Sequence, residues 1–297
     1  MSAPPGAATA RKFTRRARIA VPVVAGVAVA AWLVLAAGGP ARPTIPTGVD
    51  PPPPVPARFV PGDDAVARGS RFILSLPADR PVDYVIVLDM LRRRFGLDWV
   101  APLVDYARWA SARPGGEQAR LFARVYDPGA RLGSPPSELT RNKTDKLTST
   151  ALHCDTYPLP DDYVGDLDRS LSSRILADRT HATIALLWAD EHGCLDLADA
   201  ARLRRHAAGT LEQSVRQETS VDDQWIEAVA LLYELGEGTR VEPSWIDAIR
   251  AAQRPDGGWA EDATSTGSSG HTTTLALWVL LEAADPDAPR APWIRDP

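Results

Sequence analysis

Apolar residues recur at helical spacing along most of the chain after residue 82, and short polar or Gly/Pro-rich segments separate these runs. The pattern predicts helices over residues 82–94, 98–112, 117–125, 137–152, 163–176, 181–190, 195–215, 221–235, 244–253 and 271–284. Residues 71–76 are the one short segment for which we expect a strand. The predicted fold class is therefore all-α.

The predicted helices are of two kinds, and the two kinds alternate along the chain. Residues 195–215 carry charge over most of their helical surface and keep one apolar stripe, which is typical of a helix with one buried face. Residues 181–188, 226–233 and 271–278 are apolar nearly all round, so they should be buried on several sides. The alternation favours an inner layer of buried helices wrapped by an outer layer.

Three of the buried segments share one register at a spacing of 45 residues. The segments that begin at His181 and His271 both read H-x-T-x-x-x-L-W, and the segment from Ile226 to Tyr233 lies midway and keeps the leucine and the aromatic residue. Self-similarity at a period of about 20–50 residues indicates a repeat architecture, in which each unit is one helix pair with its loops.

The loop before the last predicted helix carries a motif. The run from Gln253 to Trp259, Q-R-P-D-G-G-W, resembles the Q-x-x-x-G-x-W repeat of the terpenoid cyclases and of protein prenyltransferase β subunits. The following run from Gly270 to Trp278 resembles an inner helix of that superfamily, and the resemblance is best over residues 243–284. It implies an α/α toroid with a central cavity. From the chain length we expect about five helix pairs, in a ring or a partial ring.

The resemblance does not bring a reaction with it, because the motif is structural. Squalene-type cyclases protonate their substrate with a D-x-D-D cluster, and this chain has none. Its acidic pairs, Asp161-Asp162 and Asp222-Asp223, are better explained as acids at helix starts, which the helix dipole favours. Prenyltransferases hold zinc with Asp, Cys and a His at the head of an inner helix, and His271 matches that last position.

Residues 19–37 form an uncharged apolar run of 19 residues. As a helix this run is roughly 28 Å long, close to the thickness of a bilayer core. Five basic residues precede it at positions 11–18, and the next ones are Arg42 and Arg58, so the preceding tail should stay in the cytoplasm. We expect an uncleaved transmembrane anchor. A cleaved signal peptide is the alternative, and both place the main domain outside the cytoplasm.

The expected organisation has four parts. A basic cytoplasmic tail spans residues 1–18 and the anchor spans residues 19–37. Residues 38–56 contain eight prolines, which predicts a stiff extended linker. Residues 57–297 then form the extracytoplasmic helical domain, at the cell membrane through residues 19–37.

The net charge of −5 conceals an asymmetry. Residues 1–56 hold six of the 33 basic side chains and one of the 38 acidic ones, which leaves 27 basic and 37 acidic side chains in residues 57–297. An acidic domain of this kind argues against nucleic acid as a partner, because phosphate binding needs clustered Lys and Arg.

The two cysteines, Cys154 and Cys194, each follow a predicted inner helix, so both should lie at the same rim. Outside the cytoplasm such a pair favours a disulfide. A zinc site built from the two cysteines with His153, Asp155 and His192 is the alternative, because these residue types bind zinc, although no C-x-x-C spacing exists. Free thiols are the third possibility.

Two of the five histidines, His181 and His271, stand at the first position of their predicted helices. Parallel inner helices would bring them to the same end of the cavity, which suggests a metal site, with zinc as the candidate ion, or a proton-transfer role. Asp256 or Glu261 in the loop before His271 could complete such a site. The alternative is that both histidines descend from one ancestral repeat and serve as caps or packing residues.

The function that these expectations favour is ligand binding or catalysis in the central cavity of a membrane-anchored toroid. A non-catalytic envelope scaffold is one alternative, and its cavity would be filled by apolar side chains. A glycan-processing toroid is another, and it would need paired carboxylates that face inward.

Overall fold

The computed structural model describes residues 64–76, 83–112 and 117–294. The chain divides into two compact units, residues 1–39 and 40–297, and every described residue belongs to the second. The expected anchor at residues 19–37 and the linker at 38–56 lie outside the described residues. Within the described part of the chain, no helix combines the length and the apolar character needed to cross a bilayer.

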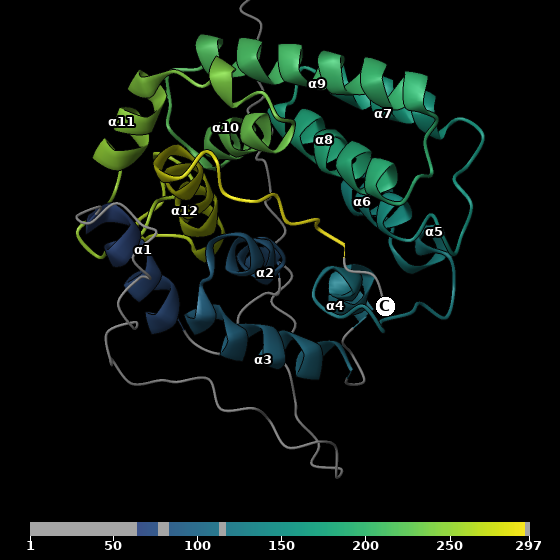
Figure 1. The fold of residues 1–297 in the computed structure, drawn as a ribbon, viewed down its shortest axis with the longest axis horizontal. Coiled ribbons are helices and arrows are strands. Elements are labelled where there is room, and N and C mark those ends of the chain that lie inside the picture. The colour runs from purple at the N-terminus through teal and green to yellow at the C-terminus, as the bar shows by residue number, and fades with distance from the viewer. Residues whose placement is uncertain (1–63, 77–82, 113–116, 295–297) are drawn as a thin grey trace, which may run out of the picture. The chain divides into compact units, whose positions relative to one another are not determined.

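The prediction of an all-helical domain is confirmed, since the described ranges contain α-helices and short 3-10 helices but no strand (Figure 1). The α-helices are α1 (Asp64–Ser75), α2 (Asp83–Phe95), α3 (Ala101–Ser111), α4 (Glu117–Phe122), α5 (Pro136–Leu139), α6 (Lys143–Leu152), α7 (Tyr163–Leu171), α8 (Leu176–Glu191), α9 (Leu197–Gln217), α10 (Asp223–Glu234), α11 (Pro243–Ala251) and α12 (Gly270–Ala284). The 3-10 helices are η1 (Asp98–Val100), η2 (Ala123–Val125) and η3 (Gly238–Arg240).

Four of the secondary-structure predictions are wrong. Helix α7 ends at Leu171, five residues before the predicted end at residue 176. The strand expected at residues 71–76 is the second half of α1, where Phe72 and Ile73 continue a buried face that starts at Ala65. Residues 137–152 form two helices, because the side chain of Asn142 accepts the backbone N–H groups of the next turn and starts α6 there. Helix α8 starts five residues before His181, and its early turn buries Thr180.

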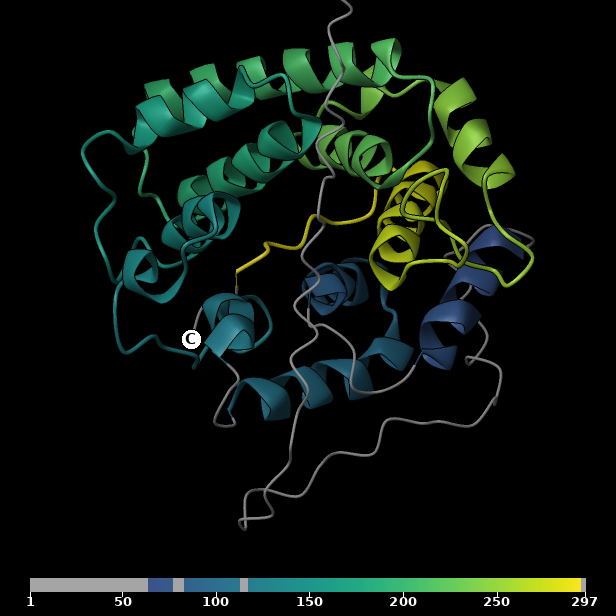
Figure 2. The ribbon, with the colours of Figure 1, turned by 180° about the vertical axis from the view of Figure 1, so that it is seen from behind.

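The two kinds of helix predicted from the sequence are both present. Helices α6, α8, α10, α12 and α2 pack against one another in that order. A second layer packs against the helices of this row, and it contains α7, α9, α11 and α1. Figures 1 and 2 show the two layers from opposite directions. Helix α12 is buried along nearly its whole length, whereas α9 buries only one stripe. Since α4 contacts α6 and η2 contacts α2, the chain of contacts also links the two ends of the row.

The first and last of the described helices, α1 and α12, are neighbours, and the Q-x-x-x-G-x-W motif lies between them. The side-chain amide of Gln253 donates to the carbonyl oxygens of Ala65 in α1, 2.8 Å away, and of Gly257 in its own loop, 2.8 Å away. Its oxygen accepts the Nε–H of Arg68 at 2.9 Å. Gly257 has φ +91, and a Cβ there would lie 2.6 Å from the carbonyl oxygen of Arg68, so the close approach requires glycine.

The tryptophan of the motif joins an outer helix to an inner one. The indole N–H of Trp259 donates to the carbonyl oxygen of Ile249 in α11 at 2.7 Å, and its backbone N–H donates to the hydroxyl of Thr273 in α12 at 3.1 Å. Trp225 at the start of α10 repeats the first contact, since its indole N–H donates to Val215 at the end of α9, 3.1 Å away. In both cases the acceptor lies ten residues earlier in the chain.

The indole hydrogen bond of Trp259 is testable with a matched control. Trp259→Phe removes that bond, and we expect it to lower the free energy of unfolding by about 1–3 kcal/mol more than Trp99→Phe does. The indole nitrogen of Trp99 is buried without a hydrogen-bond partner, so its substitution removes a similar volume but no bond. Urea unfolding of the three proteins measures the difference. Equal losses in the two variants would contradict the role given to the bond.

Candidate functional site

The N-terminal ends of α10 and α12 bring together a carboxylate and an imidazole. The Nδ1 of His271 lies 2.9 Å from an oxygen of Asp223, and the hydroxyl of Thr272 donates to that same oxygen at 2.6 Å. Because the carboxylate accepts the Nδ1–H, the lone pair of neutral His271 lies on Nε2. The pair therefore holds one tautomer of the imidazole in one orientation.

The local sequence explains why these residues stand at the helix starts. Asp222 caps α10, since its carboxylate accepts the N–H of Trp225 at 3.0 Å, and Ser269 caps α12. The backbone N–H of Asp223 donates to the carbonyl oxygen of Glu261 at 2.9 Å. This bond holds the loop between the motif and α12 against the N-terminal end of α10. Both helices thus begin at the same edge of the domain.

The carboxylate of Asp223 is ionised in spite of its burial. Burial by itself raises the pKa of Asp223, but the hydrogen bond and charge of His271 and the bonds from Thr272 and Gln224 outweigh it and hold the pKa below its ordinary value. The side chain of Asp223 is 10% exposed and that of His271 is 32% exposed. The carboxylate is thus shielded, whereas part of the imidazole reaches the surface.

Two further acceptor oxygens lie next to this pair on α10. The Oε1 of Gln224 and the Oε2 of Glu227 are buried and have no hydrogen-bond partner. Glu227 stands one turn after Asp223, so the two carboxylates project from the same face of the helix. Among the described residues, these two acceptor oxygens find no donor. A ligand that carries N–H or O–H groups would suit this region.

The structure does not give His181 the position expected for it. It is the sixth residue of α8, and its Nδ1–H donates to the carbonyl oxygen of Ala177 at 2.8 Å within the same helix. It borders a small hollow together with Lys143 of α6 and Asp178. Across the described ranges, no group of three or more His, Cys, Asp or Glu side chains has an arrangement that could hold a metal ion. The zinc role of His181 and His271 therefore stays a prediction.

The loop residues expected to join His271 have other partners. One carboxylate oxygen of Asp256 accepts the backbone N–H of Gly258 at 3.0 Å and the hydroxyl of Ser268 at 2.8 Å, so it shapes its own loop. Glu261 contributes its backbone carbonyl to Asp223. The carboxylate bonded to His271 is that of Asp223, which the sequence suggested only as an acid at a helix start.

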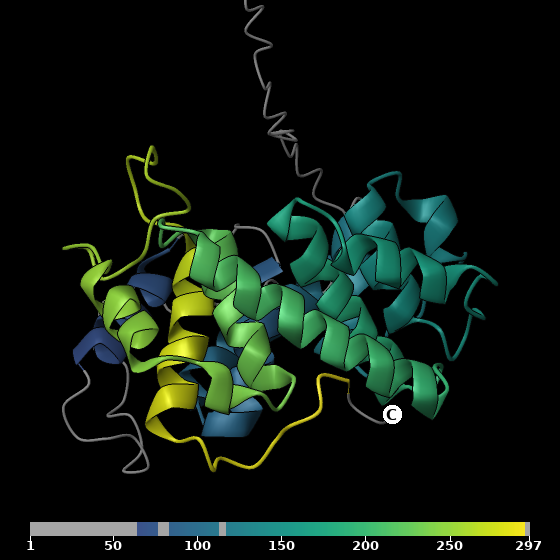
Figure 3. The same ribbon diagram turned by 90° about the horizontal axis from the view of Figure 1, so that it is seen from above.

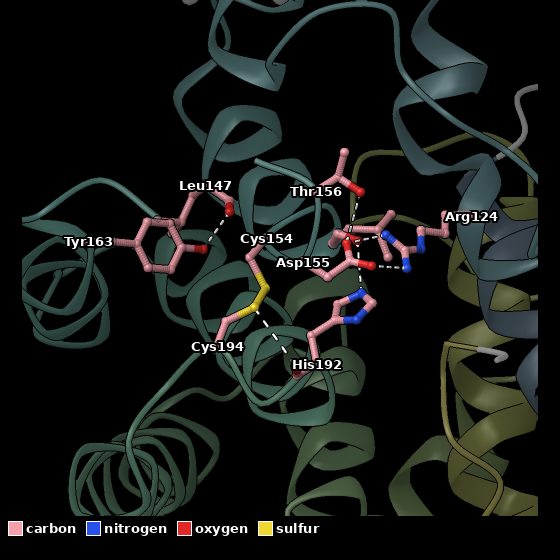
Figure 4. The surroundings of a disulfide bond; sticks show 9 residues. Arg124, Leu147, Cys154, Asp155, Thr156, Tyr163, His192 and Cys194 are labelled. Carbon is pink, nitrogen blue, oxygen red and sulfur yellow. Dashed lines mark hydrogen bonds and ion pairs between the residues drawn. A yellow bond between two sulfur atoms is a disulfide. The ribbon is translucent and has the colours of Figure 1, made fainter. Parts of the chain in front are cut away.

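The two cysteines form a disulfide, as the first of the three alternatives predicted (Figure 4). Cys154 follows α6 and Cys194 follows α8, and their Cα atoms are 6.3 Å apart. The other members of the alternative zinc set have separate partners. Asp155 forms an ion pair with Arg124, and the Nε2 atoms of His153 and His192 each lie 3.0 Å from a backbone carbonyl oxygen.

A second polar cluster lies at the opposite ends of the inner helices. Arg94, near the end of α2, donates to Glu282 of α12 at 2.6 Å and to Glu234 of α10 at 3.4 Å, and all three side chains are buried. The indole N–H groups of Trp278 and Trp293 each donate to one of these glutamates at 3.2 Å. The sequence pattern did not predict this cluster, although Glu282 stands out as the only acidic residue in the apolar helix α12.

Burial controls the protonation of this second cluster. It raises the pKa of Glu282 to about 7 against the opposing charge of Arg94, and it also raises the pKa of Glu234. Arg94 is thus shared between two buried carboxylates, and Arg290 adds a longer ion pair to Glu234, with its Nη1 3.9 Å from the carboxylate.

Comparisons with known proteins give this arrangement no relative. No family model, no curated protein and no solved structure matches the chain.

The disulfide predicts a measurable loss of stability on its removal. The bond closes a loop of 40 residues, so we expect the double variant Cys154→Ser, Cys194→Ser to unfold with a free energy about 3–4 kcal/mol lower than the wild type. Chemical denaturation with and without a reducing agent measures it. Reduction should destabilise the wild type and leave the double variant unchanged, and an effect of reduction on that variant would contradict the prediction.

His153 predicts a loss of stability in acid. Burial lowers the pKa of His153 from its ordinary value of 6.5 to about 4, so between these values the unfolded chain binds more protons than the folded one. Stability should fall by about 3 kcal/mol as the pH drops from 6.5 to 4. In His153→Gln, whose side chain does not titrate, denaturant midpoints over this range should fall by less. An equally steep fall in that variant would assign the acid sensitivity to other groups.

Proposed function

We propose that this protein is an α/α toroid, held at the outer face of a membrane by residues 19–37. The twelve α-helices of the described residues make six helix pairs, one more than the five or so expected from the chain length. The contacts that run from α6 through α8, α10 and α12 to α2, and return through η2 and α4, support the ring. The hydrogen bonds of Gln253 and Trp259 support a relationship to the cyclase and prenyltransferase superfamily, because they tie one helix to the next turn as that motif does. The cation asymmetry around residues 19–37 supports the orientation.

The function we propose for this toroid is to bind a ligand at the edge where α10 and α12 begin and to act on it by proton transfer. The single observation that carries the proposal is the buried carboxylate of Asp223, which accepts hydrogen bonds from both His271 and Thr272. Asp223 orients the imidazole and stabilises its protonated form, so that His271 Nε2 serves as the proton acceptor. The unsatisfied oxygens of Gln224 and Glu227 favour a ligand with N–H or O–H donors.

A non-catalytic scaffold is the second candidate, and a specific observation favours it. Trp188, Trp278 and Trp293 pack edge to face, with ring centres 5.4–5.9 Å apart, and they fill the opposite end of the inner helices with apolar surface. The glycan-processing alternative has less support. Glu234 and Glu282 are a carboxylate pair from neighbouring helices, but Arg94 engages both of them.

The test of the proposed site uses an internal control. His206 and Asp168 form a similar pair at 2.8 Å on α9 and α7, where both side chains are more exposed than Asp223 is. We would screen a panel of amines, oligosaccharides, polyprenyl phosphates and zinc chloride by thermal shift, and measure the affinity of each ligand found. A ligand of the proposed site should bind His271→Gln at least tenfold more weakly than the wild type and His206→Gln with unchanged affinity. Equal affinity for both variants would contradict the site.

The orienting role of Asp223 has its own measurement. In the wild type, the ¹⁵N shifts of neutral His271 should report the Nδ1–H tautomer, because the carboxylate can only accept. In Asp223→Asn the amide can donate instead, so the Nε2–H tautomer should gain population, while His206 keeps its shifts. An unchanged tautomer of His271 in this variant would remove Asp223 from the proposed mechanism.

A further inference from the structure

The chain after α12 continues without regular secondary structure, through a turn at residues 286 and 287 and a bend at residues 293 and 294. We call residues 285–294 the C-terminal segment. It leaves α12 and passes the ends of the inner helices toward α4 (Figures 1 and 3). The segment contains no helix and no strand. It is therefore held in place by its contacts with the helices.

Side chains of the helices bind the backbone of this segment on both its donor and its acceptor sides. The carboxylate of Glu191 in α8 accepts the N–H groups of Trp293 at 3.0 Å and Ile294 at 3.1 Å. The guanidinium of Arg93 in α2 donates to the carbonyl oxygens of Pro292 and of Trp293, the latter at 3.1 Å. These are charge-assisted bonds to main-chain atoms, so any extended segment of suitable side chains could make them.

One side chain of the segment is an anchor. Trp293 is 1% exposed, and its ring centre lies 5.9 Å from that of Trp188 and 5.4 Å from that of Trp278. Its indole N–H donates to Glu234 at 3.2 Å. A buried tryptophan between aromatic rings with its polar atom satisfied is typical of the residue that dominates the binding energy of a peptide.

Three of the receiving residues are also held by contacts among the helices. Asp89 in α2 is fully buried and bonds to Arg93 at 3.1 Å, which orients that guanidinium. Arg94 and Trp278 are both bonded to Glu282. This part of the binding surface is therefore positioned by the inner helices.

Two buried hydrogen-bond donors at this surface are not satisfied by the C-terminal segment. The indole N–H of Trp188 and the Nε–H of Arg94 are buried donors that have no hydrogen-bond partner. The C-terminal segment leaves both unsatisfied, so a segment that offered a carbonyl or carboxylate oxygen there would gain hydrogen bonds that the present occupant lacks.

From these observations we propose that the ends of α2, α8, α10 and α12 form a peptide-binding site for a non-helical segment with a buried tryptophan, and that the chain's own C-terminal segment occupies it as an exchangeable ligand. The partner it fits is a polypeptide that presents a tryptophan on a non-helical backbone. Because the segment follows directly on α12, Trp293 competes at high effective concentration and keeps the site closed to weak binders. The proposal does not depend on the site at His271.

The experiment uses the full chain with a protease recognition sequence inserted between Asp285 and Ala288. After cleavage and dialysis, a fluorescent peptide with the sequence of residues 288–294 is titrated and its anisotropy is measured. We expect saturable binding to the cut protein, at least tenfold weaker binding to the uncut protein, and at least tenfold weaker binding of the matched peptide with Trp293→Ala. Absence of binding to a cut protein that keeps its helical circular dichroism would overturn the proposal, and so would equal binding to cut and uncut protein.

A second measurement covers the case in which cleavage harms the fold. Loss of the cooperative unfolding transition after cleavage would mean that the segment is a fixed part of the core, and this also overturns the proposal. Hydrogen exchange on the uncut chain gives an independent answer. The amides of Trp293 and Ile294 should exchange at least tenfold faster than those in the middle of α12, whereas exchange at the same rate, through global unfolding alone, would exclude a segment that detaches.

Discussion

Helix α12 is buried on nearly every side, and much of the domain follows from the need to satisfy its polar atoms. A buried group without a partner is costly, so each polar side chain on this helix must find one inside the protein. Thr273 accepts the backbone N–H of Trp259, His271 and Thr272 bond to Asp223, and Glu282 bonds to Arg94. These partners come from the motif loop, α10 and α2. The neighbours of α12 are thereby fixed in position by the polar atoms of one apolar helix.

The same constraint separates the domain into two chemically different ends. Where α10 and α12 begin, the unpaired backbone N–H groups of the helix starts are met by Asp222 and Ser269, and the carboxylate of Asp223 lies beside them. Where the inner helices end, the buried charges of Arg94, Glu234 and Glu282 are covered by indole rings. Acid–base chemistry suits the first end, because it is partly open. Recognition of an aromatic side chain suits the second.

Sequence predicts the class of this fold well and its sites only in part. Apolar periodicity and the repeat in register identify the inner and outer helices, because burial imposes those patterns directly. The apolar pattern fails at residues 71–76 and before His181. The β-branched, aromatic and polar residues there have low helix propensity, and tertiary packing makes them helical. The equal placement of two cysteines after inner helices favoured the disulfide that is found, but it left a zinc site and free thiols open as alternatives. The partnership of Asp223 with His271 did not follow, because it joins residues 48 positions apart whose rotation about their helices is set by packing.

The contact between α1 and α12 has a consequence for the order in which the chain can fold. Gln253 and Ala65 are 188 residues apart, and the apolar face of α1 packs against α12, the last of the described helices. Contacts of such long sequence separation form late, because closing a long loop costs conformational entropy until most of the chain between its ends is ordered. Until residues 270–284 emerge during synthesis, Phe72 and Ile73 have no α12 to cover them. Among the described helices, the first to be made therefore depends on the last one for its burial, and a nascent chain carries that apolar face uncovered until α12 has been made.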